Sequence, residues 1–561
     1  MIRPVDIQAA PKQSVTSKPA GANDSPRVLL VYPRFTRPSF WNLGALCEFL
    51  DKRYPASPLG LITVAALLPE AWQLKLVDCN VEELKPEDIE WADLVLTTGM
   101  LPQQNSTIEV IRWARAIGKP VAVGGPDATS SPDVYAEADF RILGEAELVI
   151  NDFIAAWQAG ERKGLFVAEK FKADVSQTPI PRFDLLNFNN YIFIGVQYSR
   201  GCPFTCEFCD IIELYGRVPR FKTNAQMIAE IDRLYELGYR GHIDFVDDNF
   251  IGNKKAIKQF LPDLIEWQKQ RGYPFEFSTE ASINLADDDA LMKLMQDANF
   301  FAVFIGIESP DTDTLNAMKK KQNTRRSLSE SVHKIYAHGM FVLAGFILGF
   351  DSEEDNVADG MALCIEETAI PVCMIGLLYA LPNTQLTRRL ATEGRLYAGH
   401  DVIGEKRGGD QCSEGLNFET HRPRREILAD FANVLERVYA PSAYFARVRE
   451  VGRSLQRPYH GGPTSSTKDY LRLLQALWRI SIMRPSLIPY VFASVHDCLR
   501  RYPGSIASVM ALTAMYLHLG PFAYLLLRVV REQIAEIDRG DWIAPPTVPA
   551  ASRDQVLTPA A

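Results

Sequence analysis

The sequence has few cysteines and lacks the features of an exported or nucleic-acid-binding protein. Nine cysteines are spread over 561 residues without a pairing pattern, which argues against a disulfide framework and favours a reducing, cytoplasmic setting. Residues 1–25 have no apolar signal-peptide core, so export is not indicated. Lys and Arg number 60 against 69 Asp and Glu, with no long basic run. This balance argues against nucleic acid as a main partner.

Two further absences concern residues 26–160. Short apolar runs alternate there with helical patterns, which predicts a parallel sheet with helices on both faces. No G-x-G-x-x-G motif follows the first run, so we do not expect a dinucleotide at the sheet edge where such folds bind ligands. The region also contains no histidine, because the first in the chain is His242. The runs that predict strands are 27–33, 72–80, 92–99, 119–125 and 139–145.

The rest of the chain divides into a linker and two further regions. Residues 161–190 are expected to form a linker, since prolines and asparagines are frequent near its end. Six strand-and-helix units in 191–425 predict a full or partial (β/α) barrel, whose working face lies at the carboxyl ends of its strands. Residues 426–540 are predicted to be helical. The chain ends, 1–25 and 541–561, are expected to be disordered tails.

One stretch of the helical region is unusually apolar. Residues 505–527 contain no Asp, Glu, Lys or Arg and are long enough to cross a bilayer. His518, Gly520 and Pro521 interrupt the stretch, which favours two helices packed inside a soluble domain. The alternative is a surface that touches a membrane.

Three cysteines, Cys202, Cys206 and Cys209, lie close together after a predicted strand. A structural zinc site would need a fourth Cys or His nearby, but the next cysteine is Cys364 and the nearest histidine is His242. Three thiolates on a four-iron cluster leave one iron open. An open iron can bind S-adenosylmethionine (SAM) and pass an electron to it. The spacing therefore favours an iron–sulfur cluster over zinc.

The motif C-x-x-x-C-x-Φ-C resembles the signature of the radical SAM superfamily. The resemblance implies that the cysteines hold a 4Fe–4S cluster, with Phe208 near the adenine of SAM. The segment 245–250 has Asp247 and Asp248 where the family usually has glycines facing the methionine amine. Glu280, in the segment 278–282, is the candidate for the ribose hydroxyls. The implied SAM-binding residues are Phe208, Asp247, Asp248, Asn249, Ser278, Glu280 and Glu308.

The order of sheet, linker and barrel resembles the cobalamin-binding class of this superfamily. Segments 55–70, 123–133 and 143–150 are similar to motifs whose turns and helix N-termini hold the corrin. Many such domains supply a histidine to cobalt, but this region has none. We therefore expect cobalt without a histidine ligand. The implied corrin contacts of this Rossmann-like domain are Asp78, Asn80, Thr98, Gly99, Met100, Gly124, Gly125, Gly144 and Glu145.

The resemblance implies a C-methyltransferase. In the implied cycle a 5′-deoxyadenosyl radical removes hydrogen from an unactivated carbon, and methylcobalamin supplies the methyl group. A flavodoxin or ferredoxin is the implied electron donor, and a small molecule or lipid is the implied substrate. Two alternatives stay open: a ring-forming or rearranging enzyme with the same cofactors, and a non-catalytic electron carrier. Methylthio transfer is disfavoured, because it needs a second cluster and the first domain has only Cys47 and Cys79.

The C-terminal helical extension narrows the resemblance. The subgroup with such an extension includes hopanoid C-2 methyltransferases, and the segments 30–41 and 210–220 are similar to that subgroup. A hopanoid or other lipid substrate is therefore one alternative, which would suit the apolar stretch 505–527. A cytoplasmic enzyme with peripheral membrane contact is the corresponding prediction for its location.

Overall fold

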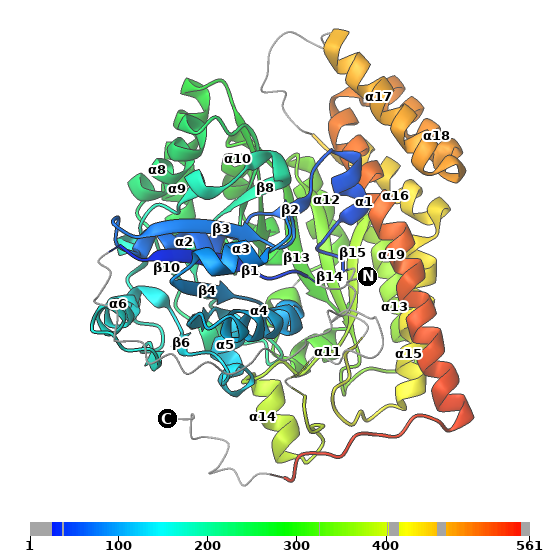
Figure 1. The fold of residues 1–561 in the computed structure, drawn as a ribbon. Coiled ribbons are helices and arrows are strands. Elements are labelled where there is room, and N and C mark those ends of the chain that lie inside the picture. Colours follow the sequence, from blue (N-terminus) through cyan, green and yellow to red (C-terminus); the bar gives the residue numbers. More distant parts are fainter. Residues whose placement is uncertain are drawn as a thin grey trace.

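The computed structural model describes residues 25–35, 39–324, 326–400, 402, 414–456 and 467–550. Of the expected tails, 1–25 and 541–561, residues 1–24 and 551–561 lie outside the described residues. The chain forms an α/β sheet domain, a larger curved sheet covered by helices, and a helical C-terminal region (Figure 1). This architecture confirms the predicted fold class.

The first sheet has six parallel strands in the order β3-β1-β4-β5-β6-β7. Apolar residues of α2 (Leu59–Leu67) and α6 (Ile150–Gln158) pack on one face. The other face is covered by α3 (Pro86–Trp91), α4 (Gln104–Ala116) and α5 (Pro126–Ser130). The sheet is doubly wound, as the near-continuous apolar runs predicted. Its strands are β1 Arg27–Tyr32, β3 Gln73–Asp78, β4 Leu94–Thr98, β5 Val121–Gly124, β6 Phe140–Leu143 and β7 Gly164–Val167.

Two strands depart from the expected boundaries. β7 lies within the segment 161–190 that we expected to be a linker, and it pairs with β6. It is an edge strand with Leu165 and Val167 more than half exposed, so no buried apolar run marks it in the sequence. β2 (Tyr54–Ala56) leaves the first region and pairs with β8 (Tyr191–Val196) of the second sheet. Its three residues are too few to show a pattern.

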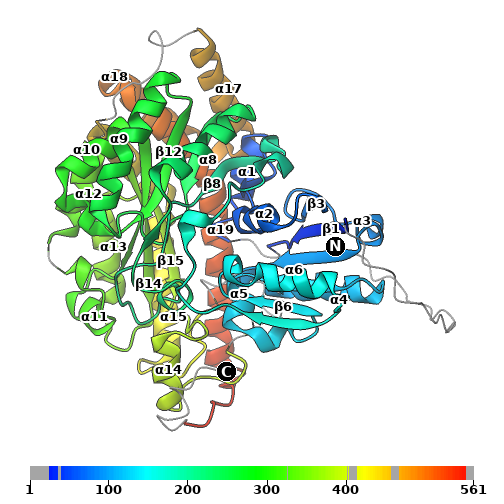
Figure 2. The same cartoon turned by 90° about the vertical axis from the view of Figure 1, so that its left-hand side faces the viewer.

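The second sheet is a parallel half-barrel, in the order β15-β14-β13-β12-β11-β8-β2. The helices α8 (Asn224–Glu236), α9 (Lys254–Gln270), α10 (Asp289–Asp297), α12 (Leu328–Ala337) and α13 (Val357–Thr368) lie along its convex side (Figure 2). β2 and β15 are its two edges, so the sheet does not close. The six predicted units correspond to β8 Tyr191–Val196, β11 Gly241–Phe245, β12 Phe275–Ala281, β13 Phe300–Glu308, β14 Phe341–Leu348 and β15 Val372–Leu377.

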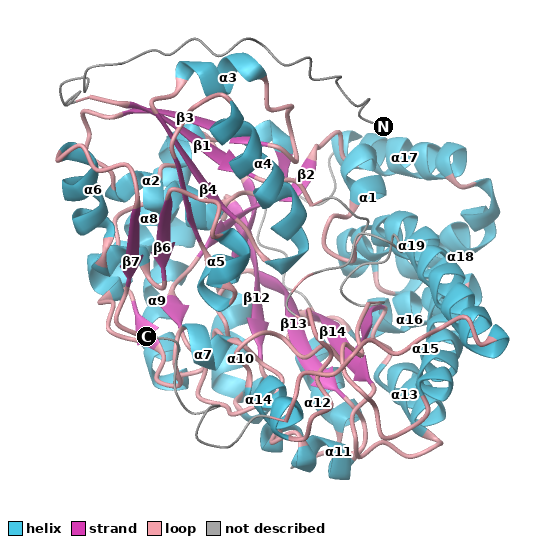
Figure 3. Ribbon diagram, turned by 60° about the horizontal axis from the view of Figure 1, so that its bottom comes forward, coloured by secondary structure: helices cyan, strands magenta, loops and turns pink. Residues whose placement is uncertain are grey.

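The C-terminal region packs its last long helix against the rest of the molecule (Figure 3). That helix, α19 (Ile506–Arg539), contacts α15 (Arg424–Tyr439) and also α1 (Gly44–Phe49) near the N-terminus. The His518 ring lies 2.9 Å from the carbonyl oxygen of Ser39, and Phe40 packs on Phe522. The other helices of the region are α15 Arg424–Tyr439, α16 Pro441–Ser454, α17 Thr467–Met483 and α18 Ile488–Arg501.

The expectation of two helices in 505–527 is wrong. α19 is one helix of 34 residues with Pro521 inside it. Gly520 gives room to the ring of Tyr516, because a Cβ there would approach that ring to 2.8 Å. The Tyr516 hydroxyl donates to the Tyr439 carbonyl at 2.6 Å. Packing along the whole helix therefore outweighs the local cost of Gly520 and Pro521.

One described helical stretch, Pro503–Arg539, is long and apolar enough to cross a membrane by length and composition. However, 67% of its most apolar window is buried inside the protein. The core helix of a soluble protein passes the same test, so this stretch is weak evidence for a membrane span.

The expected C-terminal tail is ordered over part of its length. Thr547 forms an antiparallel bridge with Tyr397, and Val548 donates its N–H to the Leu396 carbonyl at 2.7 Å. Backbone pairing with 396–398 thus holds residues 546–548, a contact that the Pro- and Ala-rich composition did not indicate.

Candidate active site

The cysteine loop follows β8 and the short strand β9 (Ser199–Arg200), and two carboxylates shape its entry. Asp247 accepts hydrogen bonds from the N–H groups of Tyr198 and Ser199. Asp248 accepts from the N–H of Gly201 at 2.6 Å. Gly201 has a φ of +99° and faces the Gly216 carbonyl closely, so only glycine suits this turn. Both predicted aspartates therefore hold the backbone that leads into the loop.

The three thiols of the loop are unpaired and mostly buried. Burial raises the pKa of Cys202, and it raises that of Cys209 well above its ordinary value with help from Asp210. Asn249 Nδ2 lies 3.9 Å from the sulfur of Cys202, and Gln322 Nε2 lies 3.8 Å from that of Cys206. A strongly positive group is needed to ionise such thiols.

The described residues contain no group of three His, Cys, Asp or Glu side chains arranged to hold a single metal ion. An iron–sulfur cluster binds each thiolate to a different iron, so it does not require one shared ion.

Polar side chains line the concave face of the half-barrel. Along β12, Phe277, Thr279 and Ala281 are buried toward the helices, while Ser278 and Glu280 alternate onto the opposite face. The Ser278 hydroxyl lies 2.6 Å from His242 Nε2 and donates to Asp244, both on β11. This network fixes Ser278 in the interior of the barrel.

The concave face is acidic and has few compensating cations. Burial raises the pKa of Asp244 and Asp247 to about 6 and that of Asp248 to about 7. Burial, followed by the charges of these neighbours, raises the pKa of Glu280 to about 8. Within the described part of the chain, the Glu280 carboxyl has no hydrogen-bond partner. The interior therefore favours a bound cation or hydrogen-bond donor.

A buried ion pair lies beside Phe208. Lys320 pairs with Glu308, and its Nζ lies 5.8 Å from the centre of the Phe208 ring. Burial opposes the charge of Lys320, but Glu308 and the sulfur of Cys206 leave its pKa raised. Glu308 ends β13 with a φ of +66°. These contacts bring two predicted residues, Phe208 and Glu308, together with a lysine that the sequence analysis missed.

A cavity of about 370 Å³ lies between the first sheet and the half-barrel. The first domain contributes the ends of its strands and the helix α2, and the barrel side contributes Gln197, Arg200, Tyr215, Lys222 and Val246. Arg200 is two residues before Cys202, so the cavity adjoins the cysteine loop. Seven predicted residues line it: Thr98, Gly99, Met100, Gly124, Gly125, Gly144 and Glu145.

Asp78 and Asn80 lie outside this cavity lining. Asp78 accepts hydrogen bonds from the Tyr191 hydroxyl at 2.9 Å and from the N–H of Asn80. The Asn80 side chain accepts from the N–H of Phe35 and donates to the Pro33 carbonyl. In the structure both residues therefore tie the end of β3 to its neighbours.

Ion pairs join the two sheets beside the cavity. Arg200 pairs with Glu145 at 3.1 Å and with Glu147 at 2.7 Å, and Arg220 pairs with Glu145 at 2.8 Å. All four side chains are less than one-fifth exposed. Glu145 therefore both lines the cavity and holds the domains together.

Several residues of the site were not predicted from the sequence. Alternation along the segment 241–245 could have placed His242 and Asp244 on one face of a strand. No local signal marks Arg200 or Arg220, because their partner Glu145 is distant in sequence. Lys320 follows its partner Glu308 more closely, but no motif of the sequence analysis included it.

A parallel half-barrel with a cysteine loop after its β8 strand, joined to a doubly wound sheet domain, is the arrangement that the radical SAM resemblance implies. A family model described as the radical SAM superfamily matches residues 196–363. A second model, a domain of unknown function (DUF4070), matches residues 384–532.

The chain is 41% identical over 547 residues to an uncharacterised methyltransferase of Synechocystis sp., covering 95% of this chain and 99% of the relative. It is 37% identical over 436 residues to the hopanoid C-2 methylase of Rhodopseudomonas palustris, covering 77% of this chain and 80% of the methylase. The chain therefore belongs to the radical SAM superfamily, in the subgroup that includes this methylase, and is an enzyme.

Two solved structures have the same fold at low identity. The cobalamin-dependent radical enzyme OxsB matches with a TM-score of 0.56 and 15% identity, over 95% of this chain and 83% of its own. The methyltransferase TsrM from Kitasatospora setae, bound to cobalamin and a 4Fe–4S cluster, has a TM-score of 0.57 and 13% identity. The match covers 91% of this chain and 100% of TsrM. These matches support the fold of both sheets together.

Proposed function

We propose that this enzyme is a cobalamin-dependent radical SAM methyltransferase that methylates an unactivated carbon. The observation that carries the proposal is the cavity between the two sheets, which adjoins the cysteine loop. In doubly wound folds, ligands bind at the edge of the sheet where the carboxyl ends of the strands lie. A corrin at this edge and a cluster on the loop would share one enclosed space.

The residues present fit a cluster and SAM. Cys202, Cys206 and Cys209 would hold the cluster, with the amides of Asn249 and Gln322 donating toward two of the sulfurs. SAM carries a sulfonium and an ammonium group, which match the acidic concave face. Glu280 would accept from the ribose hydroxyls, since its carboxyl has no hydrogen-bond partner among the described residues. Lys320, beside Phe208, would attract the SAM carboxylate.

The residues also fit a corrin in the cavity. Leu59, Val64 and Leu67 of α2 provide apolar contacts, and the glycine turns after β4, β5 and β6 expose backbone groups to it. The hydroxyl of Thr97 is buried in the lining without a partner in the described chain. No histidine lines the described cavity, which supports cobalt without a histidine ligand.

When bound, the cluster and SAM supply a hydrogen-abstracting radical, and the corrin supplies the methyl group. The chain itself would position these groups and exclude water, because radicals must meet the substrate before solvent does. The Arg200–Glu145–Arg220 pairs keep the two walls of the cavity together. Asp247 and Asp248 fix the position of the backbone before the cysteine loop, because they accept hydrogen bonds from its N–H groups.

The test is to produce the protein without oxygen and with cobalamin supplied, and to measure iron, sulfide and corrin per chain. We expect a cluster and about one corrin, with cleavage of SAM to 5′-deoxyadenosine under a reductant. The variant Cys206→Ala should lose the cluster and keep the corrin. A protein that cleaves SAM but binds no corrin would contradict the methyltransferase proposal. Product mass separates methylation from ring formation.

A lipid substrate is the finer proposal, and a hopanoid is the candidate that the relationship to the hopanoid C-2 methylase suggests. It is supported by an apolar face on the helices α17 and α18. Leu474, Trp478 and Ile482 recur at helical spacing on α17, each at least 60% exposed. Phe492 and Leu499 of α18 are also exposed. Trp and Leu with arginines nearby are typical of a surface that lies on a bilayer.

Flotation with vesicles of anionic lipid tests this contact. We expect a fraction of the cytoplasmic enzyme to float, and the double variant Trp478→Ser/Ile482→Ser to lose most of that fraction. The variant Tyr524→Ser, on the exposed side of α19, is the control and should float as before. Equal flotation of all three proteins would contradict a membrane-facing role for α17.

A further inference from the structure

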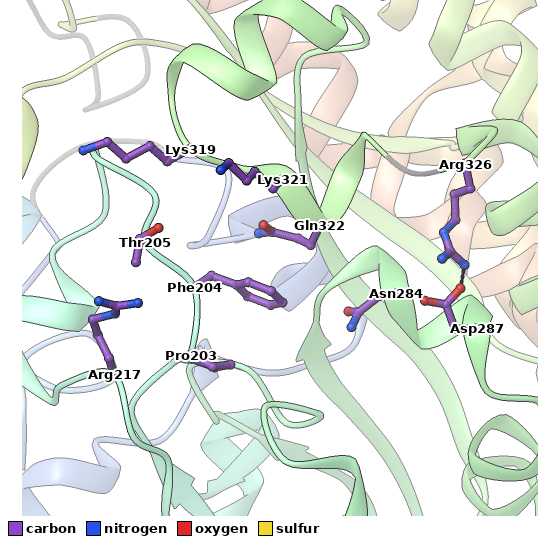
Figure 4. A pocket seen from close by; sticks show the side chains of 10 residues that line it. All are labelled: Pro203, Phe204, Thr205, Arg217, Asn284, Asp287, Lys319, Lys321, Gln322 and Arg326. Carbon is purple, nitrogen blue, oxygen red and sulfur yellow. Dashed lines mark ion pairs between the residues drawn. The ribbon is translucent and has the colours of Figure 1, made fainter.

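A second pocket, of about 280 Å³, opens beside the cysteine loop (Figure 4). Pro203, Phe204 and Thr205, which are the three residues between Cys202 and Cys206, form part of its lining. It shares no lining residue with the cavity between the two sheets. The cysteine loop can therefore be approached here without entering that cavity.

The second pocket is basic, although the whole chain carries a net charge of −9. Arg217, Lys319, Lys321 and Arg326 line it, with Asp287 as its single acidic residue. Asp287 pairs with Arg326 (Figure 4). Arg217, Lys319 and Lys321 are exposed and make no ion pair with any described residue, although Lys319 Nζ donates to Gln385 Oε1 at 2.8 Å. We call these three residues the basic patch.

One side chain connects the second pocket to a thiol. Gln322 lines the pocket, is only 9% exposed, and donates from Nε2 to the sulfur of Cys206 at 3.8 Å. Its Oε1 is buried without a partner in the described structure. On the outside, Val218 next to Arg217 is 76% exposed. An exposed apolar residue among cations is a combination suited to a transient protein contact.

We propose that the basic patch is the docking site for an acidic one-electron carrier protein of the flavodoxin or ferredoxin class. This inference rests on the proposed function, because it assumes a cluster on the three cysteines. The reduced carrier loses one electron and the oxidised cluster gains it, while no bond or proton moves. Complementary charge orients the carrier, whereas the net negative charge of both proteins disfavours docking elsewhere.

The test compares two reductants on anaerobic, cluster-loaded enzyme. The variant Lys319→Glu/Lys321→Glu reverses two charges of the basic patch. We expect cluster bleaching by photoreduced flavodoxin, followed by stopped-flow absorption, to slow by about tenfold or more at low salt. Bleaching by dithionite, which needs no docking, should be unchanged. The wild-type rate with flavodoxin should fall as salt rises, and the variant rate should depend on salt less.

The control is Lys163→Glu/Lys170→Glu, which reverses two exposed charges on the first domain and should bleach at the wild-type rate. Arg217→Gln should give an intermediate rate, and its single neutral change keeps the test valid if the double variant folds poorly. An equal slowing with dithionite, or the same flavodoxin rate in all variants, would overturn the inference.

Calorimetry with oxidised flavodoxin measures docking without any electron transfer. We expect binding to the wild-type protein and to the control, and at least tenfold weaker binding to the Lys319→Glu/Lys321→Glu variant. Binding of inorganic phosphate to the pocket with no binding of flavodoxin would overturn the inference in favour of a small anion. A missing cluster would show directly in the absorption spectrum, and that failure belongs to the proposed function instead.

Discussion

At the scale of single residues, the acidic concave face is the most unusual feature of the barrel. Glu280, Asp244, Asp247 and Asp248 are grouped there, and burial raises the pKa of each. Burial therefore shifts each of these groups toward its protonated form in the folded protein without SAM, and Glu280, with a pKa of about 8, most of all. A cationic ligand would reverse that preference, so ligand binding and proton release should be coupled.

The first prediction concerns Glu280 and pH. A carboxyl whose folded pKa is raised stabilises the fold below its unfolded pKa, and this stabilisation is lost as pH rises toward the folded value. For Glu280 that window runs from about 4.5 to about 8. The ligand-free protein should therefore lose stability between pH 6 and pH 8. Between pH 6 and pH 8, we expect the free energy of unfolding of Glu280→Gln to fall by about 1–2 kcal/mol less than that of the wild type.

Melting temperatures at the two pH values measure this effect. The control is Glu266→Gln, which changes an exposed carboxyl on α9 and should leave the pH dependence as in the wild type. Identical pH dependence in wild type and Glu280→Gln would mean that Glu280 is not the titrating group.

At the scale of elements, the two sheets are joined by charge as well as by packing. The second prediction is that Glu145→Gln destabilises the docking of the first domain. The change removes one partner from Arg200 and from Arg220, whose side chains are 12% and 17% exposed. Breaking a buried ion pair from one side typically costs about 3–5 kcal/mol. We expect faster proteolysis within residues 168–190, which follow β7.

The control for this prediction is Glu137→Gln. Glu137 pairs with Arg112 at 2.7 Å, but both side chains are about half exposed. Glu137→Gln should therefore lower the free energy of unfolding by less than about 1 kcal/mol. If both variants were cleaved at the same rate, the Arg200–Glu145–Arg220 pairs would not be what holds the domains together.

The third prediction concerns the continuity of α19. A Cβ at position 520 would lie 2.8 Å from the ring of Tyr516, which the Tyr439 carbonyl and the ring of Tyr444 hold in place. Gly520→Ala should therefore lower the free energy of unfolding by about 1–3 kcal/mol through overpacking, despite the better helix propensity of alanine.

The matched variant for this prediction is Gly360→Ala in α13. There the new Cβ would meet only an ordinary contact of 3.9 Å with Pro310, so propensity should stabilise the protein by up to about 1 kcal/mol. Urea unfolding gives both values. A stabilising Gly520→Ala would show that Tyr516 can move aside.

At the scale of the whole molecule, the half-barrel and the C-terminal helices share one hydrophobic core. That core runs from Phe40 through the barrel strands to Val530, whereas the first sheet has two separate apolar clusters, one on each face. Phe40, which follows β1 in the chain, packs on Phe522 of α19. The predicted regions 191–425 and 426–540 therefore form one packing unit.

The fourth prediction follows from this shared core. Calorimetry of the ligand-free protein should show two unfolding transitions, one for the first sheet and one for the barrel with the C-terminal helices. Phe522→Ala should lower the melting temperature of the same transition as Phe277→Ala in the barrel. Each variant should reduce the free energy of unfolding of that unit by about 3–5 kcal/mol. Phe153→Ala, in the first domain, should lower the other transition. A separate third transition, shifted by Phe522→Ala alone, would contradict a shared core.

The sequence by itself determined the order of the elements, because buried parallel strands are near-continuous apolar runs and can be located without their partners. It also determined the cysteine motif, which lies within one short loop, and the family resemblance, since each segment that carries the resemblance can be recognised without its partners in the fold. The roles of individual residues at that loop stay predictions, and the contacts of Asp247 and Asp248 with its backbone were not visible in the motif.

Only the tertiary structure decided how distant segments meet. The transfer of β2 to the second sheet, the edge strand β7 and the unbroken α19 all depend on partners far away in the chain, so local composition could not reveal them. The same holds for the basic patch beside the cysteine loop, where Arg217 lies with Lys319 and Lys321. Arg200 and Arg220 meet Glu145 only when folding brings the two sheets together, and there burial strengthens their interaction.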